Sequence, residues 1–249
     1  MKTHTSPVII MRVKEFGESD LLVTFFTPDI GRLKGVAKGA RRSLRRFVNC
    51  LDIFSLVNLE YYSPRTRGGL YFIHSGKLID PYPGLRNDFS ILSKASFMVE
   101  LTEILFPWEL PAPNIFEILK NSFHLMDQGK AIDLIPVIFE VMAMSHGGYS
   151  INLEKCCVCG RIYRGEGAAV FKPDKGGIAC LKCQQITAAT PKMSPNTINI
   201  TRLIQSTKSF NIFEKLNASD EVMLEIRPVI KLHREYHLGQ RPKTASYLE

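Results

Sequence analysis

Residues 20–37 read DLLVTFFTPDIGRLKGVA. Two short runs rich in Leu, Val and Phe lie on either side of Pro28-Asp29-Ile30-Gly31, a combination that favours a turn. Similar apolar runs, partly alternating with polar residues, occur at residues 7–16, 52–62 and 70–79. Five short strands in about 75 residues favour a small closed or nearly closed barrel, because closure leaves no exposed strand edge. An SH3-like barrel fits this pattern almost as well.

The hydrophobic period becomes helical after about residue 82. Apolar residues between 85 and 105 recur at steps of three, four and seven, as on one face of a helix. Asn114 is the expected cap of a second helix, which Gly129 closes. Further helices are expected at 131–146, 194–211 and 219–238.

Five of the six cysteines lie between residues 156 and 183. The pairs Cys156-x-x-Cys159 and Cys180-x-x-Cys183 could turn four thiolates toward one point, the tetrahedral arrangement that structural zinc prefers. The residues between the pairs predict a hairpin, as in a zinc ribbon. Four sulfur ligands leave no open coordination position, so the expected zinc is structural. Unliganded thiols or a redox pair are the alternatives. Cys157 is a rival ligand, but the two-residue spacer of Cys156-x-x-Cys159 matches the second pair and favours Cys156.

Residues 32–46, here called the basic segment, contain seven cations and no acid. Their charge of +7 is close to the net +8 of the whole chain. Arginine binds phosphate oxygens bidentately, and nearby glycines let a backbone approach phosphates closely. Phe47 could stack on a base if the segment opens onto a single strand. A solvated loop without a partner is the alternative. The candidate DNA-binding residues are Arg32, Lys34, Lys38, Arg41, Arg42, Arg45, Arg46 and Phe47.

Charge is uneven along the chain: +6 over residues 1–80, −4 over 81–150 and +6 over 151–249. We therefore expect nucleic acid on the basic flanks and protein partners on the acidic middle. The longest apolar stretch, 131–144, has only 14 residues and carries two acids, so no membrane span is expected. The N-terminus lacks the pattern of a signal peptide, and we expect a cytosolic protein.

A catalytic site is not expected. The six histidines occur in no H-E-x-x-H motif, and no nucleophile elbow is present. The basic segment also lacks the spacing of a Walker loop, so nucleotide hydrolysis is not supported.

Several stretches, in order along nearly the whole chain, resemble the RecO family of bacterial recombination mediators. The most specific is GESDLLVTFFTPDIGRLKGVAKGARRSLRRF at residues 17–47. GGYSINLEKCCVCG, the second Cys-x-x-Cys and HREYHLGQRPKTASYLE complete the resemblance. Where the family usually has Leu-Gly-Tyr before the cysteines, this chain has Gly147-Gly148-Tyr149.

The resemblance implies an α+β multidomain protein: an N-terminal OB-fold five-stranded β-barrel, residues 1–80, followed by an α-helical domain, residues 81–249. A zinc ribbon with four cysteine ligands would be embedded at about residues 151–187, with one structural Zn²⁺ per chain. The ligands carried over by position are Cys156, Cys159, Cys180 and Cys183.

The resemblance also implies an activity in DNA repair and recombination. Such a protein binds single- and double-stranded DNA and anneals complementary strands. With RecR, it helps load RecA onto strands coated by single-stranded DNA-binding protein, and it works in the cytoplasm in association with the nucleoid. The rival interpretations are an OB-fold and zinc-ribbon protein that binds RNA or the ribosome, a zinc-dependent nucleic-acid enzyme, and a scaffold without a specific nucleic-acid partner.

Overall fold

The structure is a computed structural model that describes residues 2–64, 66, 68–187, 189–207, 220–239 and 241–247. The chain forms two compact units, Met1–Ile132 and Asp133–Glu249. Of the helices in these residue ranges, none combines the length and the hydrophobicity that a bilayer span requires.

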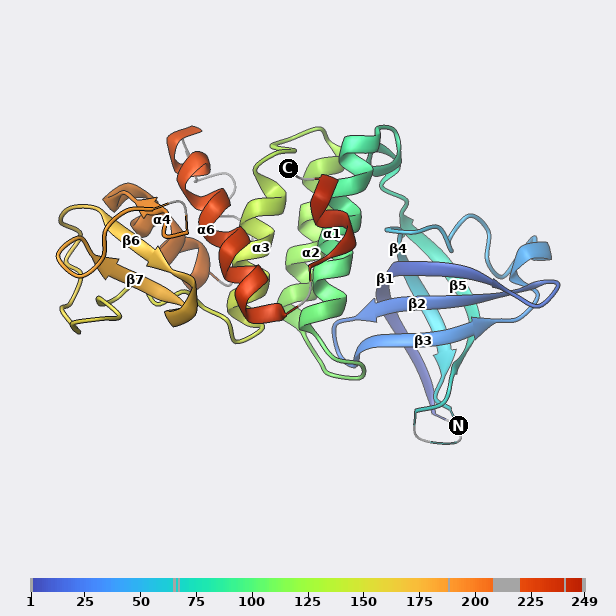
Figure 1. Ribbon diagram of the computed structural model, residues 1–249. Helices are drawn as coiled ribbons and strands as arrows, with labels where there is room; N and C mark the ends of the chain where they lie inside the picture. The colour runs from blue at the N-terminus through green and yellow to red at the C-terminus, as the bar shows by residue number, and fades with distance from the viewer. Residues whose placement is uncertain are drawn as a thin grey trace. The chain divides into compact units, whose positions relative to one another are not determined.

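The first unit begins with a five-stranded barrel (Figure 1). The strand order is β1-β2-β3-β5-β4, and β4 pairs back with β1 to close the ring. All pairs are antiparallel except β3–β5, which joins only Gly35–Ala37 to Tyr71–Ile73. The predicted five-stranded OB-type barrel is confirmed. The strands are β1 (Thr3–Phe16), β2 (Asp20–Thr27), β3 (Gly31–Ala37), β4 (Leu56–Tyr62) and β5 (Tyr71–Asp80).

Strand β1 is long enough to serve two neighbours. Its first half, Thr3–Ile9, pairs with β4, and its second half, Ile9–Phe16, pairs with β2. A register shift between Ile10 and Arg12 lets the strand bend between these partners. Alternate residues face inward, so Val8 and Ile10 lie with Cys50 in the barrel core.

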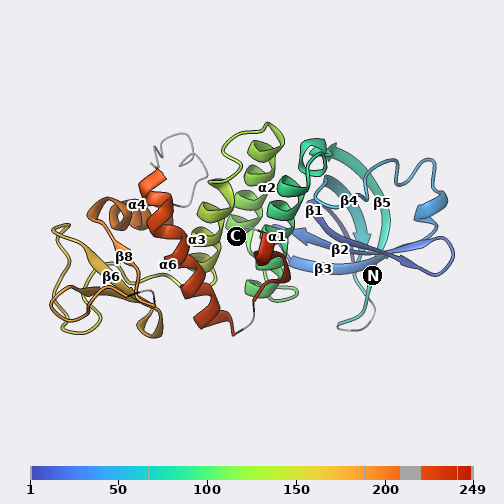
Figure 2. The ribbon, with the colours of Figure 1, turned by 45° about the horizontal axis from the view of Figure 1, so that its top comes forward.

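Two helices complete the first unit, α1 (Phe89–Leu105) and α2 (Pro113–Asp127), and they lie side by side in both views (Figures 1 and 2). Helix α2 contacts the barrel through Phe116, whose ring centre lies 6.0 Å from that of Phe26. The prediction that Asn114 caps α2 is wrong, because the helix already begins at Pro113. Proline suits the first helical position, where its missing N–H leaves no hydrogen bond unmade.

The second unit contains three described helices: α3 (Ile135–His146), α4 (Pro195–Ser206) and α6 (Asp220–Leu238). A buried ion pair joins α3 to α6, with Arg234 Nη1 2.7 Å from Glu140 Oε1. The helix predicted at 194–211 ends at Ser206, and residues 208–211 lie outside the described ranges, as does residue 219 of the helix predicted at 219–238.

The cysteine-containing segment lies between α3 and α4 in the sequence and forms a small sheet of order β7-β6-β8. Its strands are β6 (Ala169–Lys172), β7 (Gly177–Cys180) and β8 (Lys192–Met193). Gly176, at φ 55°, turns the chain between β6 and β7, so the predicted hairpin is confirmed. The sheet packs on α6, because Phe171 contacts the ring of His233 at 5.7 Å between centres.

Candidate nucleic-acid interface and metal centre

The basic segment begins within β3 and continues beyond this strand through a short 3₁₀ turn, Ala40–Arg42. Its backbone is tied to the β1–β2 turn, since the Gly39 N–H donates to Asp20 Oδ1 at 2.8 Å and the Arg41 N–H to the Ser19 carbonyl at 3.0 Å. Gly39 has a φ of 65°, a conformation that other residues rarely adopt. The segment therefore has a defined path over the barrel.

Three of the seven cations serve the protein's own structure. Arg32 is only 9% exposed and donates to the Glu103 carbonyl at 2.8 Å. Arg46 donates to the carbonyls of Lys38 and His74, at 2.6 and 3.4 Å, and so ties the segment to β5. Arg41 pairs with Glu15 at 3.1 Å. These contacts reduce what the three side chains can offer a ligand.

The other four cations are exposed, and we call them the free quartet. No ion pair to any of them occurs among the residues that the structure describes. One lies in β3 and one directly after this strand; a third lies in the 3₁₀ turn and the fourth three residues after it. The free quartet consists of Lys34, Lys38, Arg42 and Arg45. Exposed cations without acidic partners keep their full charge for phosphates.

Phe47 lies in the barrel core and is 6% exposed. It offers no open face to a base unless the basic segment leaves the barrel, so we do not include it in the proposed surface. Arg32 is also left out, because it is buried and donates to the Glu103 carbonyl. In a sequence, a buried arginine and an exposed one look alike, because burial depends on distant residues such as Glu103.

The structure also shows partly exposed aromatic residues on or beside the barrel, which the sequence did not single out as candidates for contact with bases. Tyr62 of β4 and Phe72 of β5 stack at 6.0 Å between ring centres, with planes 18° apart. Trp108, in the connection between α1 and α2, is 49% exposed. Tyr62 and Phe72 are brought together by the pairing register of β4 and β5, which is known only from the fold. For Trp108, no motif or periodic pattern in the neighbouring sequence marks a binding residue.

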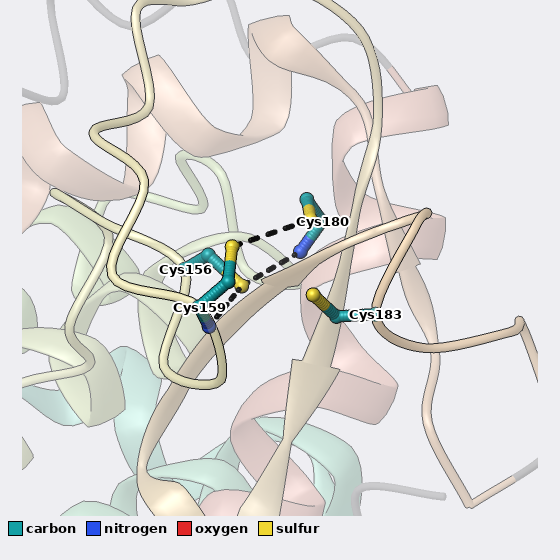
Figure 3. A group of neighbouring side chains, drawn as sticks. All are labelled: Cys156, Cys159, Cys180 and Cys183. Carbon is teal, nitrogen blue, oxygen red and sulfur yellow. Dashed lines mark hydrogen bonds between the residues drawn. The ribbon is translucent and has the colours of Figure 1, made fainter.

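The four predicted metal ligands converge (Figure 3). The sulfurs of Cys156, Cys159, Cys180 and Cys183 all lie within 4.8 Å of one another. The Cys159 and Cys180 sulfurs are 3.9 Å apart, too far for a disulfide. Tetrahedral coordination with Zn–S bonds of about 2.3 Å separates sulfurs by about 3.8 Å. The cluster therefore has the dimensions of a four-thiolate metal site.

The surrounding backbone favours thiolate at Cys156. Burial raises the pKa of this thiol, but the N–H groups of Cys159 and Cys180 point at its sulfur, at 3.5 and 3.3 Å, and such hydrogen bonds lower the pKa to about 6. Cys157 is outside the cluster, and its N–H instead donates to the Ile178 carbonyl at 2.8 Å. Of the two neighbours, Cys156 is the one whose sulfur lies in the cluster.

Family models cover both parts of the chain. The model described as "Recombination protein O N terminal" matches residues 1–82, and "Recombination protein O C terminal" matches residues 86–246. The chain belongs to the RecO family.

Curated members of the RecO family align over most of this chain. A protein named "DNA repair protein RecO" from Desulfatibacillum aliphaticivorans is 30% identical over 100% of this chain and 97% of its own length. Its namesake from Syntrophobacter fumaroxidans is 36% identical over 72% of this chain and 71% of its own. That from Syntrophus aciditrophicus is 27% identical over 99% and 95%. The similarity therefore extends across both compact units.

Proposed function

We propose that this RecO-family chain is a DNA-repair and recombination mediator without catalytic activity of its own. It binds single- and double-stranded DNA, anneals complementary strands and, with RecR, helps load RecA onto strands coated by single-stranded DNA-binding protein. It works in the cytoplasm, in association with the nucleoid. The observation that carries the proposal is the free quartet: four exposed cations on the barrel of a RecO-type fold.

Annealing requires two polyanions to approach each other. Cations that contact phosphates screen this repulsion and leave base edges free to pair, since phosphate contacts position DNA without reading its sequence. If each member of the free quartet neutralises one phosphate of a single strand, log K falls with log salt at a slope of about −2.8. Binding should depend little on sequence.

The test compares Arg42→Ala/Arg45→Ala with the matched control Lys120→Ala/Lys130→Ala. Both pairs remove two cations from the first unit, but the control residues lie on α2 and just after it. We expect the first variant to reduce the salt slope by about 1.4 and to slow annealing of complementary oligonucleotides, with the control unchanged. Equal slopes in the two variants would refute the role of the free quartet.

The RNA-binding alternative is tested on the same protein. Affinities for DNA and RNA single strands of one sequence are compared, and annealing is repeated with strands coated by single-stranded DNA-binding protein. Preference for RNA together with failure to anneal coated DNA would favour the RNA-binding interpretation.

We further propose that the cysteine cluster holds one structural Zn²⁺ through Cys156, Cys159, Cys180 and Cys183. The sulfur spacing and the N–H groups directed at Cys156 support this assignment. Bound zinc would supply the cross-link between the two cysteine loops, and four thiolates would leave no position for a substrate. The site therefore stabilises the fold and performs no chemistry.

A further inference from the structure

The connection between α1 and α2 completes one edge of the barrel. Strand β3 pairs with β5 only from Gly35 onward, which leaves its first residues without a partner on that side. Trp108 forms a parallel bridge with Arg32 there, and the Glu109 N–H donates to the Arg32 carbonyl at 3.1 Å. Trp108 is therefore held on the barrel by backbone contacts.

The indole of Trp108 has one supported face and one open face. The guanidinium carbon of Arg32 lies 4.0 Å from the ring centre, a cation–π contact. Arg32 is itself fixed by its hydrogen bond to Glu103. Trp108 is still 49% exposed. Because Arg32 covers one face of the ring, we assign this exposure to the other face and the ring edge.

A cavity of about 420 Å³ adjoins the indole, and its lining includes Lys34, Tyr71 and Glu109. Lys34 belongs to the free quartet. The Tyr71 hydroxyl donates to Glu109 Oε1 at 3.1 Å. A carboxylate repels phosphate, so the part of the cavity beside Glu109 suits an uncharged, flat group, while Lys34 suits the phosphate attached to it.

These observations describe a nucleotide with an unstacked base. Aromatic side chains beside a cationic groove bind single strands by stacking, whatever the base. Duplex bases are already stacked and paired, and they cannot reach an indole in this way. From Arg32, six residues lead along and just past β3 to Lys38, roughly 20 Å. A strand anchored at Trp108 can therefore continue over the rest of the free quartet.

We propose that Trp108 is a base-stacking platform that gives this chain a contact with single-stranded DNA that duplex DNA does not make. The inference rests on the proposed DNA-binding function and specifies one contact within it. Arg32 acts as a positioning residue that holds the indole, and Lys34 binds the adjacent phosphate.

Trp108 is the one tryptophan of the sequence, so its fluorescence reports directly on the site. The full chain is titrated with a labelled oligothymidylate and with a duplex of equal length, and label anisotropy measures binding independently of the indole. We expect the single strand to quench Trp108 and the duplex to leave its emission nearly unchanged. An anisotropy that shows no binding of either DNA would refute the proposed function. Binding of the single strand without a change in emission would refute only the stacking.

Substitution gives a second readout. Trp108→Ala should weaken single-strand binding roughly 5- to 150-fold and leave duplex binding within about twofold, since one stacked base is lost. Trp108→Phe keeps an aromatic face and should recover much of the affinity, which an unfolded protein would not do. Phe89→Ala is the control, because it removes an exposed aromatic ring of the same unit. Equal losses for single strand and duplex, or no loss for either, would overturn the proposal.

Discussion

Gly31 allows the connection between α1 and α2 to pack closely against the start of β3. Its φ is 89°, and a Cβ at this position would overlap the backbone carbonyl of Leu110. An alanine side chain therefore meets both an unfavourable backbone conformation and a close neighbour that cannot rotate away.

We expect Gly31→Ala to lower the free energy of unfolding by about 2 kcal/mol or more, from strain plus overlap. Gly17→Ala is the matched control, because Gly17 has a φ of 68° but nothing within 4 Å of the added Cβ. The control should lose only about 1 kcal/mol. Urea unfolding with an unchanged m-value measures both losses, and equal losses would show that Leu110 does not restrict this position.

His233 couples the stability of the second unit to pH. Burial lowers its pKa to about 4, and the ring, 1% exposed, donates from Nε2 to the Tyr149 carbonyl at 2.7 Å. The unfolded chain takes up this proton near pH 6.5, but the folded chain only near pH 4. The stabilisation is therefore complete above pH 6.5 and is lost as pH falls toward 4.

For this group alone, stability should fall by about 1.4 kcal/mol per pH unit below 6.5, and by roughly 3 kcal/mol in all. His233→Gln should remove that slope, and His124→Gln, which changes an exposed histidine, should keep it. Urea unfolding at several pH values from 7.5 to 4.5 measures the slopes. The same slope in His233→Gln and wild type would contradict the assignment.

At the scale of elements, the two cysteine loops are brought together by the β6–β7 hairpin, and only one of the adjacent cysteines faces the cluster. Cys156→Ser should reduce bound zinc well below one per chain, whereas Cys157→Ser should keep one equivalent. Elemental analysis of the purified variants measures this. Zinc loss from Cys157→Ser with retention in Cys156→Ser would reverse the ligand assignment.

The same scale shows what sequence patterns can predict. The five strands and the β6–β7 hairpin follow from local alternation and turn residues, and the convergence of Cys156, Cys159, Cys180 and Cys183 follows from two identical spacings. The bridge between Arg32 and Trp108 joins residues 76 positions apart and leaves no periodic trace. In the sequence, the seven cations of the basic segment likewise look equally available to a ligand. The residues that engage Arg41 and Arg32, which are Glu15 and Glu103, come from other elements.

At the scale of the whole molecule, the two compact units should respond differently to metal removal. The cluster cysteines all belong to the unit Asp133–Glu249, and Trp108 belongs to Met1–Ile132. In the full chain, a zinc chelator should lower the melting temperature of the second unit by about 10 °C or more. The helical circular dichroism, to which both units contribute, should then show an earlier transition in addition to that of α1 and α2. Trp108 fluorescence should report an unchanged transition for the first unit. Equal shifts of both signals would mean that the units unfold as one.

The division of β1 between two partners has a consequence for synthesis on the ribosome. Strands β1, β2 and β3 are neighbours in sequence and can pair as a meander as soon as they emerge. The remaining edges find their partners only when β4 and β5, which end at Asp80, have left the exit tunnel. Until then the nascent chain exposes the unpaired edges of β1 and β3, and the basic segment belongs to a sheet that has not yet closed into a barrel.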